Sequence, residues 1–296
     1  MNNDTKKTGI LIVGHGSKLP YNKEVVSEIA EKLDKKMDNV VERGFMELVL
    51  PNIPQQVDKL KEQGMERIIV VPAFLAHGVH TKVDIPTILK LPHEHIGLDH
   101  SHTHHHHHHQ HHHGEDEERE AKSDLIDFDG EVIFLDPFEA DDKVVDIVEN
   151  RITECISENN LNNENTGILL VGHGSSLPFG KEVLMGVTNK IKDRIQEYKI
   201  DCGFMQIEKP SIPESFKKLQ DNGFENMVVV PVFLADGLHT KVDIPNRLGL
   251  EPMELDFKYR KLEKQIDFDG NIYFLNPLKA EDEIVEMIEE RIKNYL

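Results

Sequence analysis

An internal repeat is the feature that most constrains how this chain folds. The segments 9–20 and 167–178 share an apolar run followed by Gly-His-Gly-Ser, at an offset of 158 residues. Farther along, the segment 70–86 recurs as 229–245 at an offset of 159. Because this period is the length of a domain, the repeat indicates a duplicated domain rather than a solenoid of short units.

The two copies differ in length at one place. The motif Ile-Asp-Phe-Asp-Gly occurs at 126–130 and again at 266–270, so the offset falls to 140 and the first copy carries 19 additional residues. We therefore predict a first domain at 1–156 and a second at 167–296. The polar stretch 157–166 is the predicted linker, and the first domain contains an insertion at about 93–122.

Each copy alternates short apolar runs with amphipathic segments. The runs 10–13, 67–71 and 131–135 are typical of strands buried on both faces, and 40–46 is a weaker strand candidate. Helices are predicted over 23–37, 54–63 and 140–155. The pattern predicts an α/β fold of two duplicated, doubly wound domains, each with a mainly parallel four-stranded sheet flanked by helices.

The composition excludes several classes of partner. The 296 residues carry a net charge of −20, which argues against binding to nucleic acid or to an anionic membrane surface. No apolar run approaches the ~18 residues that cross a bilayer, and the start lacks a signal-peptide pattern, so we expect a soluble cytoplasmic protein. Cys155 and Cys202 are too few for a disulfide scaffold or a thiolate zinc site.

Two histidine motifs in each copy follow predicted strands. His15 and His80 come after the first and third strands, and their counterparts are His173 and His239. In a parallel α/β sheet, ligands bind outside the carboxyl ends of the strands. A lone loop histidine is more often a hydrogen-bonding or capping residue. However, a duplicated core does not require exposed histidines to be retained in both copies, so the four together predict a functional site.

Other polar residues are predicted at the same edge. Glu47 follows the second strand and is matched by Gln206, while His77 is matched by Asp236. Imidazoles beside a carboxylate suit divalent cobalt, nickel, zinc or iron, and histidines also act as bases near neutral pH. The competing interpretation of Glu47 is a solvated surface carboxylate.

The insertion is dominated by histidine. Thirteen of the 18 histidines lie within 93–113, and an acidic run follows at 115–118. Such a tract cannot form a core, so we predict a disordered, native loop that collects metal. An inserted affinity tag is the alternative, but tags stand at termini and this run is interrupted. The densest part comprises His104, His105, His106, His107, His108, His109, His111, His112 and His113.

The motifs resemble those of the class II tetrapyrrole chelatases, specifically the sirohydrochlorin chelatases of the cobalamin, siroheme and coenzyme F430 pathways. The segments 11–20 and 71–81 are similar to two signatures of that family. The likeness is greatest to the short archaeal enzymes, which are homodimers of one repeat and often carry a His-rich loop here. The resemblance covers nearly the whole chain and implies a fused duplication that forms an intramolecular pseudo-dimer.

The resemblance implies a lyase that inserts Co²⁺ or Ni²⁺ into sirohydrochlorin without ATP or an organic cofactor, the metal being a substrate. It implies that His15, His80, His173 and His239 bind the metal and act in catalysis, with Glu47 as a carboxylate near the metal. Glu47 and His77 favour the first half-site. Since sirohydrochlorin is rich in carboxylates, we also expect it to be bound by cations and donors: Ser17, Thr81, Lys82, Ser175, Ser176, Thr240 and Lys241.

Three alternatives remain at this stage. The His-rich loop is compatible with a metal-storage protein or metallochaperone, and the family also includes siroheme ferrochelatases. A histidine-nucleophile phosphatase has arginine before its His-Gly pair, whereas Gly14 and Gly172 stand there in this chain. That third alternative is therefore the weakest.

Overall fold

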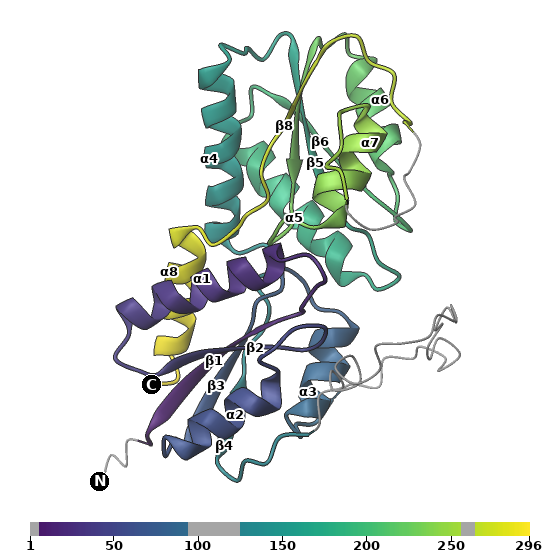
Figure 1. Cartoon of the computed structure of the whole chain (residues 1–296). Helices are drawn as coiled ribbons and strands as arrows, with labels where there is room; N and C mark the ends of the chain where they lie inside the picture. The colour runs from purple at the N-terminus through teal and green to yellow at the C-terminus, as the bar shows by residue number, and fades with distance from the viewer. Residues whose placement is uncertain (1–5, 94–124, 256–263) are drawn as a thin grey trace, which may run out of the picture.

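The computed structural model describes residues 6–93, 125–255 and 264–296, which form two lobes of the same architecture (Figure 1). Each lobe contains a four-stranded parallel sheet with helices on both faces, so the predicted fold class is confirmed. The strand orders are β2-β1-β3-β4 and β6-β5-β7-β8. The predicted His-rich insertion lies outside the described residues, apart from its edge at His93.

Among its described residues, the first repeat contributes four strands and four α-helices. Its strands are β1 (Thr8–Gly14), β2 (Val41–Phe45), β3 (Arg67–Pro72) and β4 (Glu131–Phe134). Its helices are α1 (Tyr21–Lys36), α2 (Ile53–Glu62), α3 (Ile85–Ile88) and α4 (Asp142–Glu158).

The second repeat contributes the same set. Its strands are β5 (Thr166–Gly172), β6 (Lys199–Phe204), β7 (Asn226–Pro231) and β8 (Asn271–Phe274). Its helices are α5 (Phe179–Arg194), α6 (Ile212–Gln220), α7 (Ile244–Leu248) and α8 (Asp282–Lys293).

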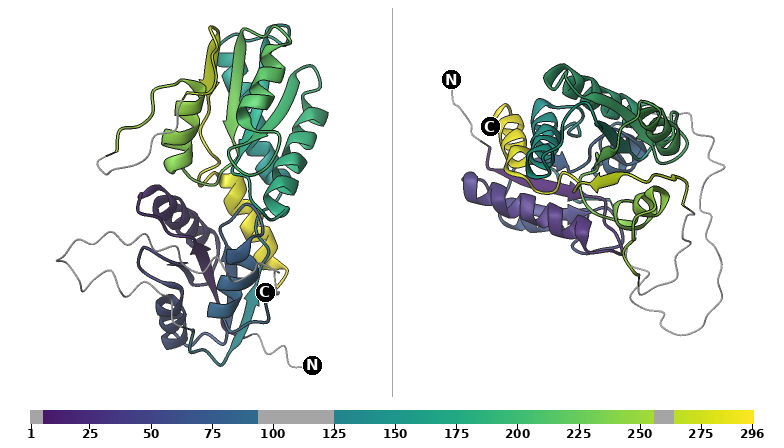
Figure 2. Two further views of the ribbon diagram at one scale, coloured as in Figure 1. Left: turned by 90° about the vertical axis from the view of Figure 1, so that its right-hand side faces the viewer. Right: turned by 90° about the horizontal axis from the view of Figure 1, so that it is seen from above.

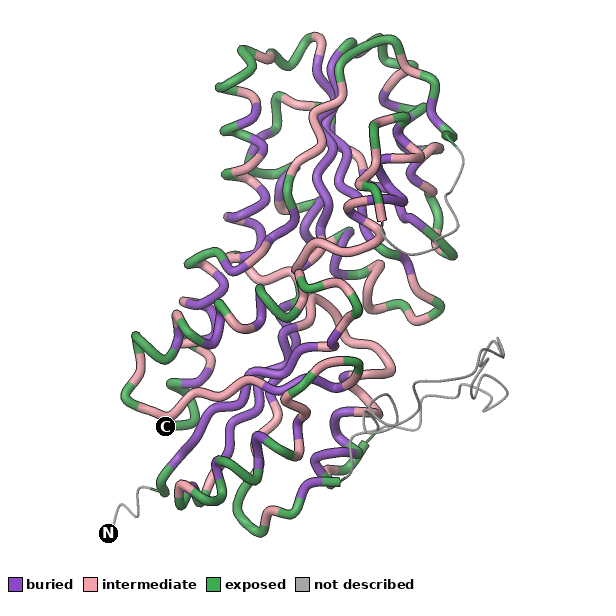
Figure 3. Tube along the Cα trace, in the orientation of Figure 1, coloured by how far each residue is buried: buried purple, intermediate pink, exposed green. Residues whose placement is uncertain are grey.

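Successive residues of the central strands face opposite sides of each sheet. In β1, Ile10 and Ile12 belong to the core beneath α1, whereas Leu11 and Val13 pack with α2 and α3 on the other face. All four side chains are fully buried, which explains why the strand lacks polar alternation (Figure 3). The continuous apolar runs in the sequence therefore correspond to strands covered on both faces.

Two local predictions need correction. The predicted linker 157–166 includes the last two residues of α4 and the first residue of β5, so the irregular stretch is 159–165. The segment after His80 was expected to be a loop, but it forms a π-helical turn (His80–Asp84) that continues into α3. An equivalent turn (His239–Asp243) precedes α7. These turns lack the long apolar periodicity by which a helix is recognised in sequence.

The two repeats exchange their last helices. Helix α4 ends the first repeat but packs against α5 and β7 of the second, while α8 packs against α1 of the first. Figure 1 shows α8 beside α1 in one lobe and α4 beside the other sheet, and the two helices contact each other where the lobes join (Figure 2). A single hydrophobic cluster consequently runs from one sheet to the other through these helices.

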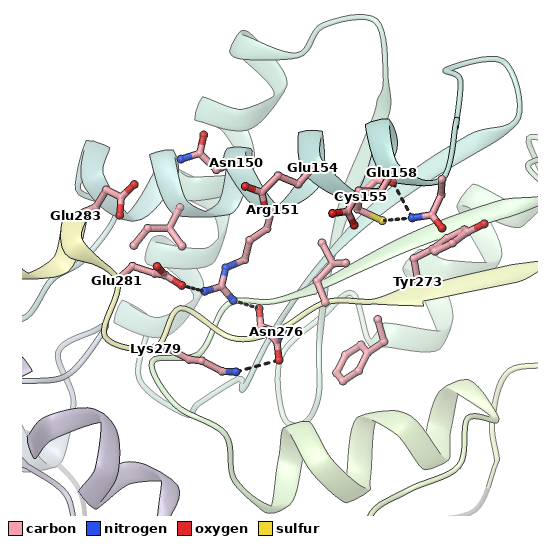
Figure 4. Close-up of a pocket in the computed structure, with 14 residues that line it drawn as sticks. Asn150, Arg151, Glu154, Cys155, Glu158, Tyr273, Asn276, Lys279, Glu281 and Glu283 are labelled. Atoms are coloured by element: carbon pink, nitrogen blue, oxygen red, sulfur yellow. Dashed lines mark hydrogen bonds and ion pairs between the residues drawn. The ribbon is translucent and has the colours of Figure 1, made fainter. Parts of the chain in front are cut away.

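Two arginines fasten the exchanged helices. Arg151 of α4 donates to the carbonyl oxygens of Asn276 at 2.7 Å and Leu278 at 2.9 Å, and to the Glu281 carboxylate at 2.7 Å (Figure 4). It also donates to the carbonyl of Pro277. Arg291 of α8 repeats this arrangement on the loop after β4, donating to Pro137, Phe138 and Asp141. Each guanidinium thus satisfies carbonyl groups of the other repeat.

Within the described ranges, no helix combines the length and apolar character needed to span a membrane.

Arg151→Ala should lower the free energy of unfolding by about 2–4 kcal/mol, because several carbonyls and one carboxylate lose a charged donor in a largely buried place. Urea denaturation monitored by circular dichroism measures the change. Lys217→Ala is the matched control, since it removes an exposed ion pair to Asp221 and should cost less than ~0.5 kcal/mol. Equal losses from the two variants would contradict a fastening role for Arg151.

Candidate functional site

The four predicted histidines form two pairs, one in each repeat. His15 follows β1 and His80 opens the π-helical turn, and their Nε2 atoms are 3.1 Å apart. In the second repeat, the Nε2 atoms of His173 and His239 are 3.2 Å apart. The parallel strands bring these loops together because their carboxyl ends share one edge of the sheet.

The hydrogen bonds of the first pair determine which nitrogens face each other. The Nδ1 of His15 lies 2.7 Å from the Gly16 carbonyl oxygen, which can only accept, so this nitrogen carries the proton. The Nδ1 of His80 lies 2.8 Å from the carboxylate of Asp84 and donates to it. In this tautomer, each imidazole directs an Nε2 lone pair at the same point.

Two facing lone pairs need a cation between them. Metal–imidazole bonds are about 2.0–2.1 Å long, so nitrogens separated by 3.1 Å would hold one ion at an angle of about 95–102°. A proton shared by the pair is the alternative occupant. The arrangement can therefore exchange a metal ion for a proton at one place.

The second pair is built in the same way. The Nδ1 of His173 lies 2.7 Å from the Gly174 carbonyl, and that of His239 lies 2.7 Å from the carboxylate of Asp243. Burial lowers the pKa of His173 below its ordinary value of 6.5, the neighbouring His239 lowers it further, and the Gly174 carbonyl partly opposes both. His173 is therefore neutral at neutral pH.

Two aspartates that were not among the residues predicted from the sequence orient the pairs. Asp84 and Asp243 lie four residues after His80 and His239, which is the spacing of neighbours on one face of a helical turn. A carboxylate on the outer ring nitrogen holds the tautomer and raises the basicity of the inner nitrogen. The repeated pentapeptide His-Thr-Lys-Val-Asp was the available signal. Four-residue spacing points to a contact only within a helical turn, and the sequence indicates a loop here.

The two half-sites differ next to the histidines. An oxygen of the Glu47 carboxylate lies 3.5 Å from the Nε2 of His15, whereas the Gln206 amide nitrogen lies 3.4 Å from the Nε2 of His173. An anion attracts a metal cation to the lone pair, but an amide N–H competes for that lone pair. The first half-site is therefore electrostatically better suited to a divalent metal.

The second difference is at His77, whose equivalent is Asp236. The Nε2 of His77 lies 3.3 Å from Asp136 and 3.7 Å from Glu139. The equivalent Asp236 lies 3.2 Å from Lys241 and 3.9 Å from Lys279. Each repeat thus joins this position to the loop after its last strand, through carboxylates beside His77 in the first repeat and through Lys279 beside Asp236 in the second.

The predicted substrate-binding hydroxyls differ in accessibility. The Ser17 and Ser175 hydroxyl oxygens accept from the backbone N–H groups of Leu19 and Leu177 and stay half-buried, and Ser176 is exposed. Thr81 and Thr240 are buried, and each hydroxyl is engaged with the backbone of the glycine three residues earlier. In the free protein these threonines shape the loop that carries His80 and His239.

The two predicted lysines each lie near an aromatic ring of the other repeat. The ammonium of Lys82 lies 5.8 Å from the ring centre of Phe179, which begins α5 of the other repeat. The ammonium of Lys241 lies 5.9 Å from the ring centre of Tyr21, which begins α1. Because all four residues belong to loops or helix starts at the carboxyl edges of the sheets, the two edges meet across the lobes.

The described residues contain no group of three or more histidine, cysteine or acidic side chains arranged to hold a metal ion. Each half-site thus offers two imidazoles and leaves most coordination positions to another ligand. A cavity of about 540 Å³ lies elsewhere, around Arg151 and Cys155 between α4 and β8 (Figure 4). The histidine pairs take no part in its lining.

Both repeats match the model of a known protein family. The family model described as CbiX matches residues 9–155 and again 167–295. The chain belongs to the CbiX family. The two matches coincide with the two sequence repeats, so the resemblance and the tandem duplication are both confirmed.

Curated relatives have the length of a single repeat. The "Sirohydrochlorin cobaltochelatase" of Methanothermobacter thermautotrophicus is 46% identical over 154 residues, covering 52% of this chain and 96% of that protein. The protein of the same name from Methanocaldococcus jannaschii is 53% identical over 143 residues, covering 48% of this chain and 95% of its own length.

Solved structures share the two-lobed fold. Bacillus subtilis SirB with Fe³⁺ superposes with a TM-score of 0.66 at 20% identity, covering 97% of this chain and 94% of that chain. The sirohydrochlorin chelatase SirB in complex with cobalt gives a TM-score of 0.62 at 19% identity, with the same coverage. At these low sequence identities, the similarity shows only that the fold is shared.

Removing the orienting carboxylates should weaken metal binding. Asp84→Ala and Asp243→Ala each free one Nδ1–H, so we expect about 10–100-fold weaker Co²⁺ affinity at the corresponding pair. Isothermal titration of the metal-free protein measures this. The isosteric variants Asp84→Asn and Asp243→Asn keep the shape but lose the charge, and should give intermediate affinities. Unchanged affinity in the alanine variants would contradict an orienting role.

The lowered pKa of His173 gives a pH prediction. In the metal-free protein, its imidazole should lose its proton at a pH below 6.5, so the neutral form persists as the pH falls towards that value. Proton NMR of the ring Cε1–H resonance measures the titration. His239→Ala should raise the pKa of His173, because it exposes the His173 imidazole to water and removes a neighbouring cation. A wild-type midpoint at or above 6.5 would be inconsistent with the desolvated environment.

Proposed function

We propose that this protein is a lyase that inserts Co²⁺ into sirohydrochlorin, with the metal and the tetrapyrrole as its substrates. The observation that carries the proposal is the pair of converging Nε2 lone pairs in each of two CbiX-family repeats. The names of the curated relatives indicate the same metal and tetrapyrrole.

The first pair is the proposed place where the metal is held before insertion. His15 and His80 supply two adjacent imidazole ligands, and Glu47 adds a negative charge 3.5 Å from one of them. Two ligands bind a transition metal weakly enough to release it, and they leave coordination positions for the pyrrole nitrogens. A site that surrounds the metal ion with four protein ligands would instead favour metal storage.

The second pair is the proposed proton acceptor. Insertion of a divalent ion releases two pyrrole N–H protons. The second pair has one place for a proton, between its two Nε2 atoms 3.2 Å apart, so it receives one proton and water receives the other. His173 is neutral at neutral pH because of its burial, and Asp243 stabilises the cation that forms when His239 accepts a proton. This assignment gives the two half-sites different roles, as expected from the Glu47 and Gln206 difference.

The carboxylates of the tetrapyrrole need cations and hydrogen-bond donors. Lys82 and Lys241 lie where the two edges meet, and Ser17, Ser175 and Ser176 are accessible at the same loops. We propose that these groups bind the carboxylate periphery. Thr81 and Thr240 belong to the same proposed set, and a contact with substrate requires their buried hydroxyls to exchange a loop hydrogen bond for one to the ligand.

The decisive assay is anaerobic absorbance spectroscopy of sirohydrochlorin with the protein and Co²⁺, Ni²⁺ or Fe²⁺ in parallel. We expect a protein-dependent spectral change with Co²⁺. Faster insertion of Ni²⁺ or Fe²⁺ would favour the F430 or siroheme alternative, and no change with any metal would overturn the chelatase proposal. Deleting residues 93–113 addresses the storage alternative, because a chelatase keeps its turnover at ample metal.

Single substitutions at Glu47 and at Gln206 test which half-site holds the metal. Glu47→Gln should lower the rate of cobalt insertion about 10–100-fold, because the first pair loses its anion and gains a competing amide. Gln206→Glu is the matched control and should leave most of the rate intact. A larger loss from Gln206→Glu than from Glu47→Gln would place the metal in the second half-site.

A further inference from the structure

Two exposed aliphatic side chains follow directly after the residues that distinguish the half-sites. Leu48 and Ile207 are 51% and 69% exposed. Among the large hydrophobic residues exposed in the described part of the chain, no other two occupy equivalent positions of the repeats. Core packing does not explain their retention, since neither is buried.

The backbone at both positions is strained. The N–H of Val49 donates to the Glu47 carbonyl at 2.8 Å, and that of Glu208 donates to the Gln206 carbonyl at 2.6 Å. Leu48 and Ile207 are the central residues of these three-residue turns, with φ of 65° and 64°. This form of γ-turn is rare, and positive φ is costly for bulky and β-branched residues. Glycine or asparagine would meet the backbone requirement at lower cost.

The turns are fastened to the histidine loops. The N–H of Glu47 donates to the His15 carbonyl, and the N–H of Gln206 donates to the His173 carbonyl, both at 3.1 Å. Gly16 makes this close approach possible, since a Cβ there would lie 1.8 Å from the Glu47 carbonyl oxygen, and the corresponding distance at Gly174 is 1.9 Å. The aliphatic side chains are thus held in a fixed relation to the imidazole pairs.

We propose that Leu48 and Ile207 contact the apolar faces of the bound tetrapyrrole, one from each repeat, and position the ring against the histidine pairs. The inference rests on the proposed function. Lysines and hydroxyls suit the carboxylate periphery of such a ligand, but its conjugated faces require apolar contacts. Moving the two side chains from water onto those faces provides hydrophobic binding free energy without rearranging the loop.

The double variant Leu48→Asn with Ile207→Asn tests the proposal, because asparagine tolerates positive φ and is similar in size to leucine. We expect binding of metal-free sirohydrochlorin, followed by fluorescence titration, to weaken by about tenfold or more. The melting temperature should not fall. Binding of Co²⁺ in the absence of tetrapyrrole should change by less than about twofold, which a general disturbance of the site would not reproduce.

Two further variants complete the experiment. Leu48→Met with Ile207→Leu keeps apolar side chains and should retain wild-type binding, and Leu296→Asn alters a similarly exposed residue at the C-terminus as a control. If the asparagine variant melts earlier, Leu48→Gly with Ile207→Gly replaces it, since glycine adopts the turn without strain.

The outcomes separate the two proposals. Wild-type affinity for sirohydrochlorin in the double variant overturns the contact proposal alone. A wild-type protein that binds sirohydrochlorin but inserts no metal overturns the proposed function, while the titration still decides the contact. A wild-type protein that does not bind sirohydrochlorin overturns both.

Discussion

The exchange of α4 and α8 between the repeats is the packing arrangement on which the rest of the molecule depends. Each sheet has one face completed by a helix from the other repeat, and one hydrophobic cluster continues through both lobes. Arg151 and Arg291 reinforce the exchange by donating to carbonyls of the opposite repeat. The helices of one repeat therefore do not by themselves cover both faces of its sheet completely.

This exchange also sets how the functional edges meet. Lys82 and Lys241, from the loops that carry the histidines, each contact an aromatic ring at the start of a helix in the other repeat. A single repeat carries one such edge, whereas this chain carries both. In this chain the linkage is covalent, so the two halves are free to differ.

The differences are concentrated beside the imidazole pairs. Glu47 of the first repeat corresponds to Gln206 of the second, and His77, which lies beside carboxylates, corresponds to Asp236, which lies beside lysines. Both histidine pairs and both orienting aspartates nevertheless keep the same geometry. The imidazoles are thus the same in both repeats, while their neighbours differ. This difference suits the two roles proposed for the sites, which are to bind the metal ion in one and to accept a proton in the other.

Much of the fold was predictable because both faces of the central strands are covered. Ile10, Leu11, Ile12 and Val13 form an uninterrupted apolar run for that reason, and the repeat supplied the domain count. The histidines were predictable because they occur twice at strand ends. Asp84 was missed because a π-helical turn has no apolar periodicity, so its contact with His80 is visible only once the turn is built.

The sequence by itself determined the duplicated α/β architecture and the four histidines, since these follow from local apolar patterns and from repetition. Only the tertiary structure decided which helix covers which sheet, because α4 has the same amphipathic pattern whichever repeat it packs against. It also decided that the Nε2 lone pairs converge. That depends on the hydrogen bonds of each Nδ1 to Gly16 and Asp84, and on strand register, which brings together residues 65 positions apart.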